Sequence, residues 1–271
     1  MNQLEALLEE HYSCEPSPHV VDRLIYYLDE HPRVTHESID FIKRITMVGK
    51  RCMDTYPYII QPRLPTLIQY CDDGLERLAT SPQPTGAHNY ALTRLLGHKA
   101  TMSAKLFELH NDCDMGLQAA SCATEVGRLT EETEQQFAMF YYTLAGQVMR
   151  SLCSAYADTI YAKGWYDAHK IAGKLARGVS NGSDGNPPPH MRRHAAQSFL
   201  SAAAGAMFMF KRKPLKEWRK RTAECCDHAW ESASIYSDGE MDGLRSKVIA
   251  YRSQIKVPEY PYRARPYQRE K

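Results

Sequence analysis

The sequence predicts an all-α protein built from stacked antiparallel helical hairpins. Apolar residues recur at helical spacing along most of the chain. No alternating run of Val, Ile and Thr bounded by turn residues marks a strand, and no Asn-Gly turn joins two such runs. Proline, glycine and asparagine interrupt the helical pattern repeatedly. The hydrophobic fraction of 43% is sufficient for a packed core.

The first part of the chain predicts three helices, which we expect to cap the array. The first begins at Ser17 and Pro18, because the N–H that proline lacks would have no partner within the helix at the first helical position. His31-Pro32 ends this helix. The other two are predicted over residues 36–54 and 65–79. The loop that begins at Ser81 is the predicted domain boundary. The prediction is an N-terminal helical segment over 1–84, a helical-repeat domain over 85–257 and a flexible tail over 258–271.

The second part predicts longer helices joined by tight turns near residues 112, 164 and 213. Gly164 is predicted to end a long helix that begins near Thr130, with Ala168 and Ala172 facing that helix from the next one. The loop over 178–189 and the tail are predicted to be mobile, because their composition leaves little apolar area to bury. The remaining helices are predicted over residues 90–109, 113–127, 165–177, 190–210, 215–235 and 240–255.

Around these turns the sequence resembles the tetratricopeptide repeat, over about residues 88–236. The residues that carry the resemblance are Phe107, Asn111, Asp112, Cys113, Gly116, Ala120 and Ala123 at the first turn, Ile160, Gly164, Trp165, Tyr166, Ala168, Ala172 and Ala176 at the second, and more loosely Met209, Pro214, Leu215, Trp218 and Cys225 at the third. The units here are longer than the 34 residues of that family. The resemblance implies an α-solenoid whose first helices line a concave groove.

If that implication holds, the groove binds a peptide or partner protein that carries an apolar anchor. The implied lining residues are His98, Thr101, Lys105 and Glu108 in the first unit, Ser151, Ser154, Asp158 and Tyr161 in the second, and Leu200, Ala203, Met207 and Phe210 in the third. The alternative interpretation is that these stripes are ordinary solvated faces, or core in the third unit.

A basic segment suggests a second function, association with nucleic acid. Residues 211–221 contain a single acid, Glu217, and seven bases, which are Lys211, Arg212, Lys213, Lys216, Arg219, Lys220 and Arg221. Trp218 lies among them, and the tail adds further basic residues with tyrosines. Basic patches with interleaved aromatic residues hold phosphates and stack bases. The competing interpretation is a solvated helix start with Trp218 buried.

No catalytic, metal or cofactor motif stands out. His190 and His194 are one helical turn apart, but two ligands are too few for a zinc site. The acidic pairs Asp72-Asp73 and Asp112-Asp114 stand at predicted helix starts or turns, where carboxylates favour the helix dipole. The eight cysteines are irregularly spaced without C-x-x-C, which favours reduced core thiols. An enzyme is therefore unsupported, and no cofactor is expected.

The overall charge and hydropathy suggest a cytoplasmic protein. The net charge of +2 does not favour a general polyanion binder. No apolar run is long enough for a transmembrane helix, and the acidic, amphipathic N-terminus does not resemble a signal peptide. The sequence leaves the oligomeric state and the identity of the partner open.

Overall fold

The computed structural model describes residues 16–34, 37–80, 86–179, 187–233 and 239–255. Every regular element in these ranges is a helix and none is a strand, which confirms the all-α prediction. The helices are α2 (Pro18–Glu30), α3 (Ile39–Thr55), α4 (Pro57–Ile60), the 3₁₀ turn η1 (Gln61–Arg63), α5 (Leu64–Ala79), α6 (Gly86–His110), α7 (Cys113–Thr130), α8 (Gln135–Tyr156), α9 (Thr159–Gly178), α10 (Pro189–Arg212), α11 (Lys216–Ala233) and α12 (Gly239–Gln254).

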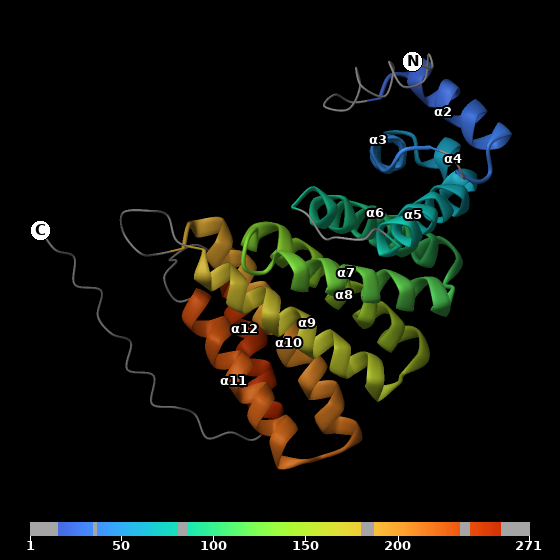
Figure 1. The fold of residues 1–271 in the computed structure, drawn as a ribbon. Helices are drawn as coiled ribbons and strands as arrows, with labels where there is room; N and C mark the ends of the chain where they lie inside the picture. Colours follow the sequence, from blue (N-terminus) through green and yellow to red (C-terminus); the bar gives the residue numbers. More distant parts are fainter. Residues whose placement is uncertain (1–15, 35–36, 81–85, 180–186, 234–238, 256–271) are drawn as a thin grey trace, which may run out of the picture.

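The helices are arranged largely in chain order. From α6 onward each helix packs mainly against the one before it and the one after it (Figure 1). No helix in the described ranges combines the length and apolarity needed to cross a membrane. The predicted tail over 258–271 and most of the loop over 178–189 lie outside the described residues.

Local signals set several of the helix starts. Pro18 occupies the first turn of α2, as predicted. The Ser38 hydroxyl accepts a hydrogen bond of 3.1 Å from the Phe41 N–H at the start of α3. The Asp112 carboxylate accepts from the N–H groups of Asp114 and Met115 at the start of α7. These caps satisfy backbone donors that lack a partner within the helix.

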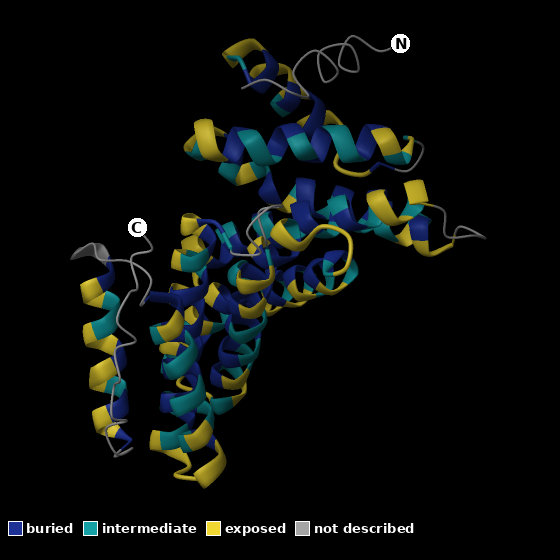
Figure 2. Ribbon diagram, turned by 90° about the vertical axis from the view of Figure 1, so that its left-hand side faces the viewer, coloured by how far each residue is buried: buried dark blue, intermediate teal, exposed yellow. Residues whose placement is uncertain are grey.

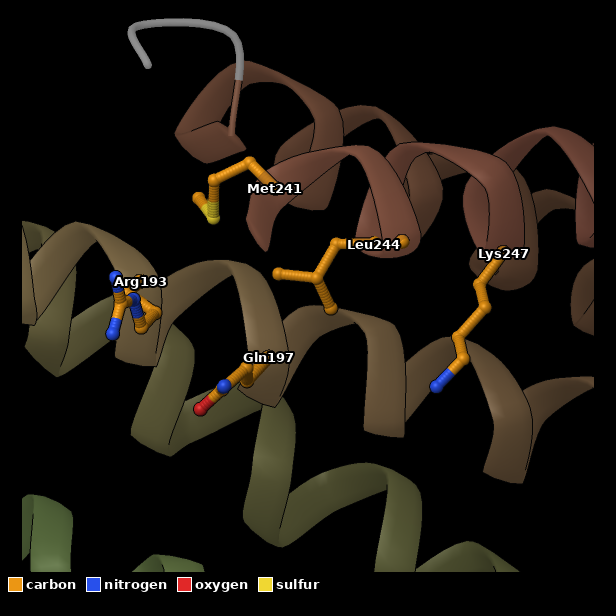
Figure 3. A pocket seen from close by; sticks show the side chains of 6 residues that line it. Arg193, Gln197, Met241, Leu244 and Lys247 are labelled. Carbon is orange, nitrogen blue, oxygen red and sulfur yellow. The ribbon is translucent and has the colours of Figure 1, made fainter. Parts of the chain in front are cut away.

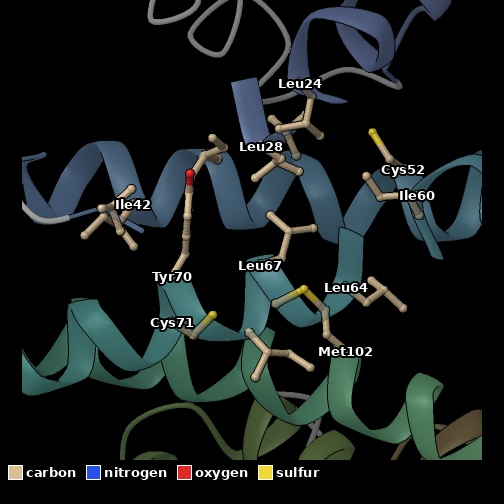
Figure 4. Packing of buried hydrophobic residues seen from close by; sticks show 14 of the residues in the cluster. Leu24, Leu28, Ile42, Cys52, Ile60, Leu64, Leu67, Tyr70, Cys71 and Met102 are labelled. Atoms are coloured by element: carbon tan, nitrogen blue, oxygen red, sulfur yellow. The ribbon is translucent and has the colours of Figure 1, made fainter. Parts of the chain in front are cut away.

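One hydrophobic core joins α2, α3, α5 and α6 (Figure 4). Leu67 of α5 is fully buried against α3, where Gly49 leaves room for its methyl groups. A Cβ on Gly49 would lie 2.5 Å from Leu67 Cδ1. Met102 of α6 belongs to the same core, so this core includes residues on both sides of the predicted domain boundary.

The second turn lies at Ala157 and Asp158, and the prediction of a turn at Gly164 is wrong. Ala157 adopts a left-handed conformation with φ 54° and ends α8, and the Asp158 carboxylate caps α9 by accepting from the Ile160 N–H at 2.8 Å. The predicted helix over 130–162 is likewise wrong at its start, because Thr130 ends α7 and α8 begins at Gln135.

Gly164 instead lies inside α9 and serves close packing. A Cβ there would lie 3.0 Å from the Met149 sulfur on α8. Ala168 and Ala172 are buried, in agreement with their predicted inward position. The correction makes the spacing of the three turns less even than the prediction required.

A second large core contains residues of helices α8 through α12, among them several aromatic side chains. Figure 2 shows buried positions along these helices. The Trp165 indole N–H donates a hydrogen bond of 2.8 Å to the Ser201 hydroxyl on α10. The rings of Tyr166 and Trp218 meet edge to face at 5.6 Å between centroids. Trp218 is therefore part of the interior, as the second interpretation of the basic segment expected.

Candidate partner-binding edge

Three helix-to-helix turns lie at the same end of the array, because consecutive helices reverse direction (Figure 1). They join α6 to α7, α8 to α9 and α10 to α11. We call this surface the turn edge and define it as residues 108–117, 154–161 and 211–216. The first two turns share one construction. Asn111 and Ala157 both have φ 54°, and each is followed by an aspartate that caps the next helix.

Side chains connect the first two turns directly. The Tyr156 hydroxyl donates a hydrogen bond of 3.0 Å to the Asn111 carbonyl. The Cys113 sulfur lies 3.4 Å from the Tyr161 hydroxyl, and the rings of Tyr156 and Tyr161 meet edge to face. The two turns are thereby held as one continuous surface.

The end of α10 lies close to the end of α8, since Cys153 of α8 and Met209 of α10 belong to the same buried cluster. Burial raises the pKa of the Cys153 thiol on α8, and the positive charge of Arg212 on α10 partly opposes that rise. The basic segment therefore belongs to the same end of the molecule as the two linked turns.

Large apolar side chains gather on the turn edge without being covered. Ile160 is 71% exposed and Leu215 is 54% exposed, whereas an interior aliphatic side chain in this protein is nearly inaccessible. The other exposed apolar residues of the edge are Leu109, Leu117 and Tyr156. Large exposed apolar side chains that gather at one end of a protein are candidates for an interaction site.

The basic segment divides into an exposed part and a packed part. Lys211, Arg212, Lys213 and Lys216 are exposed, and the described residues place no carboxylate in an ion pair with them. Arg221 is different, because its guanidinium lies 4.6 Å from the Trp218 ring centroid and also bonds Glu217. Lys220 pairs with Glu224 at 3.8 Å, and Arg219 is half-buried. Lys220 is exposed as well, so the exposed cations without an ion pair in the described ranges are Lys211, Arg212, Lys213 and Lys216.

The predicted groove residues do not form one surface. His98 and Met207 are buried in helix contacts, as are Leu200 and Ala203, so they line no open groove. These residues are buried because their helices lie inside the array. α6 packs between α5 and α7, and α10 packs between α9 and α11, so both faces are covered. The residues that remain accessible are Glu108, Ser151, Ser154 and Asp158, with Thr101, Lys105, Tyr161 and Phe210 half-buried.

The candidate metal-binding residues have structural roles instead. Asp73 forms an ion pair with Arg33 at 2.8 Å and accepts from the Val34 N–H, and Asp72 pairs with Lys99. His194 Nε2 lies 3.0 Å from the Thr143 hydroxyl of α8, whereas His190 is exposed. No group of three or more potential ligands occurs in the part of the chain that the structure describes.

An open pocket of about 450 Å³ lies between α10 and α12 (Figure 3). Leu244 points from α12 toward α10, and Arg193 and Lys247 stand on either side of it. The full lining is Arg193, Gln197, Met241, Gly243, Leu244 and Lys247. Arg193 belongs to the first turns of α10, so this pocket is at the opposite end of that helix from the turn edge.

The turn at Ala157 was not predicted, although the sequence contains a helix-capping pattern directly after it. Asp158-Thr159 is a capping pattern, but the preceding alanine is not a residue that typically adopts a positive φ. Gly164, seven positions later, has the residue type that more often ends a helix.

The cysteines among the described residues are free thiols, as predicted. Cys52, Cys71, Cys153, Cys225 and Cys226 are buried and unbridged, and Cys113 and Cys122 are half-buried. Cys14 lies outside the described residues. Burial raises the pKa of the Cys52 thiol to about 12, which keeps it protonated and unreactive.

Comparison with protein-family models and with curated proteins finds no match to this chain.

Proposed function

We propose that the protein is an interaction scaffold that binds a partner protein along the turn edge. In this proposal the pairs α6–α7, α8–α9 and α10–α11 act as stacked repeat-like units, in keeping with the resemblance to tetratricopeptide repeats. The proposed binding surface is moved from the groove of the first helices to the ends of the pairs, because His98, Leu200, Ala203 and Met207 are buried and the predicted groove is not one open surface.

The observation that carries the proposal is the exposed apolar surface around Ile160. The Ile160 side chain is 71% exposed. Covering apolar area of this kind lowers the free energy by roughly 25 cal/mol per Å² removed from water. Leu109, Leu117 and Tyr156 are exposed at the same end of the array. A partner that covers these side chains recovers that free energy.

The charge of the edge indicates the chemistry of the partner. Lys211, Lys213 and Lys216 are exposed beside the apolar surface and have no ion pair within the described ranges. An acidic amphipathic segment complements both features, because its apolar face covers Ile160 while its carboxylates approach the lysines. The interaction is therefore expected to weaken as salt concentration rises.

The matched variants Ile160→Asp and Ile249→Asp test the proposal. Both replace an exposed isoleucine on a helix, but Ile249 lies on α12, away from the turn edge. Tagged chains are incubated with cell lysate, and the captured proteins are compared. We expect the unchanged chain and Ile249→Asp to capture the same protein and Ile160→Asp to lose it. Equal capture by both variants would contradict the proposal.

The nucleic-acid alternative is separated by a nuclease arm in the same experiment. If nuclease treatment abolishes capture, and Lys213→Glu with Lys216→Glu abolishes binding of a single-stranded oligonucleotide, then the basic segment binds nucleic acid instead. If capture survives nuclease and is reduced by salt, the acidic protein partner is supported.

A further inference from the structure

The stretch that precedes α2 combines acidic residues with a regular apolar pattern. Residues 1–15 contain four glutamates and neither lysine nor arginine. Its apolar residues at helical spacing are Leu4, Leu7, Leu8 and Tyr12, and the opposite side of the same helical pattern carries Glu5, Glu9 and Glu10. The stretch lies outside the described residues. Its sequence is that of an acidic amphipathic segment, which is the chemistry expected of a partner for the turn edge.

Charge distinguishes the two ends of the chain as candidates for that role. The stretch over residues 256–271 contains five basic residues and only two acidic ones. Lys211, Lys213 and Lys216 of the turn edge are exposed and have no ion pair within the described ranges. These lysines repel the basic stretch and attract the glutamates of residues 1–15. The acidic end of the chain is therefore the one that complements the edge.

The charges of the turn edge also give a bound segment an orientation. The carboxylates of the edge belong to its first two turns and are Glu108, Asp112, Asp114 and Asp158. Glu108 pairs with Lys105, and Asp112 and Asp158 accept hydrogen bonds from helix N–H groups. The cations are gathered at the third turn, between α10 and α11. The acidic side of the segment is therefore directed toward this third turn.

The apolar side of the segment matches the rest of the edge. Ile160 is 71% exposed, and Leu109, Leu117 and Tyr156 are exposed at the same end of the array. An amphipathic helix covers such a surface with apolar residues three and four positions apart. Leu4, Leu7 and Leu8 have this spacing.

The segment that reaches the basic part of the edge belongs to another copy of the chain. α2 packs against α3 at one end of the array, and the α10–α11 turn lies at the other end (Figure 1). Contacts run from α2 through α3, α6 and α8 toward α10, and each of these four helix-to-helix steps is about 8–10 Å. Residues 1–15 bound as a helix extend only about 22 Å, which is shorter than the four steps together.

We propose that residues 1–15 of one copy bind the turn edge of a second copy, so that the chain associates with itself head to tail. The inference rests on the proposed function, because it takes the same edge and names its occupant. The two surfaces are different, so the contact is heterologous, and association continues into longer chains or closes into a ring. An outside partner of the same chemistry competes with the segment for the edge.

Sedimentation velocity of the full chain tests the proposal over a wide range of protein concentration, with a thiol reductant present so that Cys14 forms no disulfide. We expect the average mass to rise with concentration and to fall toward that of the monomer as salt is added. Ile160→Asp should stay monomeric, and Ile249→Asp should associate like the unchanged chain. A chain that stays monomeric at every concentration in low salt would overturn the proposal.

A charge exchange identifies the two surfaces that meet. The acid variant carries Glu5→Lys, Glu9→Lys and Glu10→Lys, and the edge variant carries Lys211→Glu, Lys213→Glu and Lys216→Glu. Each variant alone should stay monomeric, because its segment and its edge then have the same sign of charge. An equal mixture should associate again, since every segment meets an edge of opposite charge. This recovery shows that both variants are folded.

The single change Lys174→Glu is the control, because Lys174 is exposed on α9 near the end of that helix away from the turn edge. It should associate like the unchanged chain. Association of the acid or edge variant at the level of this control would contradict the proposal, and so would a mixture that stays monomeric.

The same variants separate this inference from the proposed function. If the chain is monomeric but still captures a lysate protein in a manner that depends on Ile160, the edge binds an outside partner and only the self-association is refuted. If the charge exchange restores association while Ile160→Asp and Ile249→Asp capture lysate proteins equally, the proposed outside partner is refuted and the self-association stands.

Discussion

At the scale of single residues, the buried imidazole of His169 makes the fold sensitive to acid. Its ring is 5% exposed, and neither nitrogen has a hydrogen-bond partner in the described residues. Burial, together with the charges of His194 and Arg150, lowers the pKa of His169 to about 4. The native state therefore favours the neutral ring.

The resulting pH dependence has a definite sign. Because the native pKa is below the unfolded value of about 6.5, the unfolded chain takes up a proton first as pH falls. The contribution of the neutral ring is complete above about pH 6.5 and is lost progressively toward the native pKa, by about 3 kcal/mol at most. His98 acts in the same direction: its contribution also begins to be lost below about pH 6.5, and the loss continues down to its native pKa of about 3.

The variant His169→Phe tests this dependence, because it keeps a ring of similar shape and cannot titrate. Urea unfolding is measured between pH 7 and pH 4. We expect the free energy of unfolding to fall less steeply with acid in His169→Phe than in the unchanged chain. His190→Gln is the control, since His190 is exposed. Parallel pH curves for His169→Phe and the control would refute the prediction.

At the scale of helices, glycine controls how closely neighbouring helices approach. Gly146 of α8 faces the His169 ring of α9, and a Cβ there would lie 2.5 Å from His169 Cδ2. Gly164 of α9 faces the Met149 side chain of α8, with the nearest atom at 3.0 Å. The first neighbour is a confined ring, whereas the second is a flexible chain that can move.

Alanine at these two positions is therefore expected to act in opposite ways. Gly146→Ala should destabilise the protein by roughly 1–3 kcal/mol through overpacking. Gly164→Ala should be neutral or stabilising by up to about 1 kcal/mol, because alanine is the better helix former and φ there is helical. Chemical denaturation of both variants provides the measurement. A strong loss of stability in Gly164→Ala alone would contradict this prediction and would indicate that Gly164 needs the positive φ of a turn.

At the scale of the whole molecule, the chain-order packing limits how far a disturbance spreads. The core around Leu67 belongs to α2, α3, α5 and α6, and the core around Phe199 belongs to α8 through α12. Smaller clusters around Tyr141 and Phe107 lie between them. Where most contacts join neighbours in sequence, local opening is expected to stay near its origin.

The variant Leu67→Ala tests that expectation. Removing a fully buried leucine side chain should destabilise its surroundings by about 2–5 kcal/mol. Hydrogen exchange followed by mass spectrometry should show faster exchange in α3 and α5, with α10 and α11 nearly unchanged. Phe199→Ala serves as the reciprocal control, with the loss expected in α9 to α11. Uniform acceleration over all helices in either variant would show one cooperative unit.

The sequence by itself determined the helical class and most helix bounds, because periodicity and capping depend on residues a few positions apart. Pro18, Ser38 and Asp112 carry such local signals, and the helices begin beside them as expected. The burial of Trp218 was also among the interpretations that the sequence supported.

Only the tertiary structure decided features that depend on a neighbouring helix. Gly164 has the composition of a turn, yet the approach of Met149 makes it an interior packing position. His98 follows a polar stripe in the sequence, yet α3 covers it. Lys43 and Tyr90 are separated along the chain and share no motif, so their contact depends on how α3 and α6 pack. Such contacts have no periodic signature, since each is fixed by the shape of both partners at once.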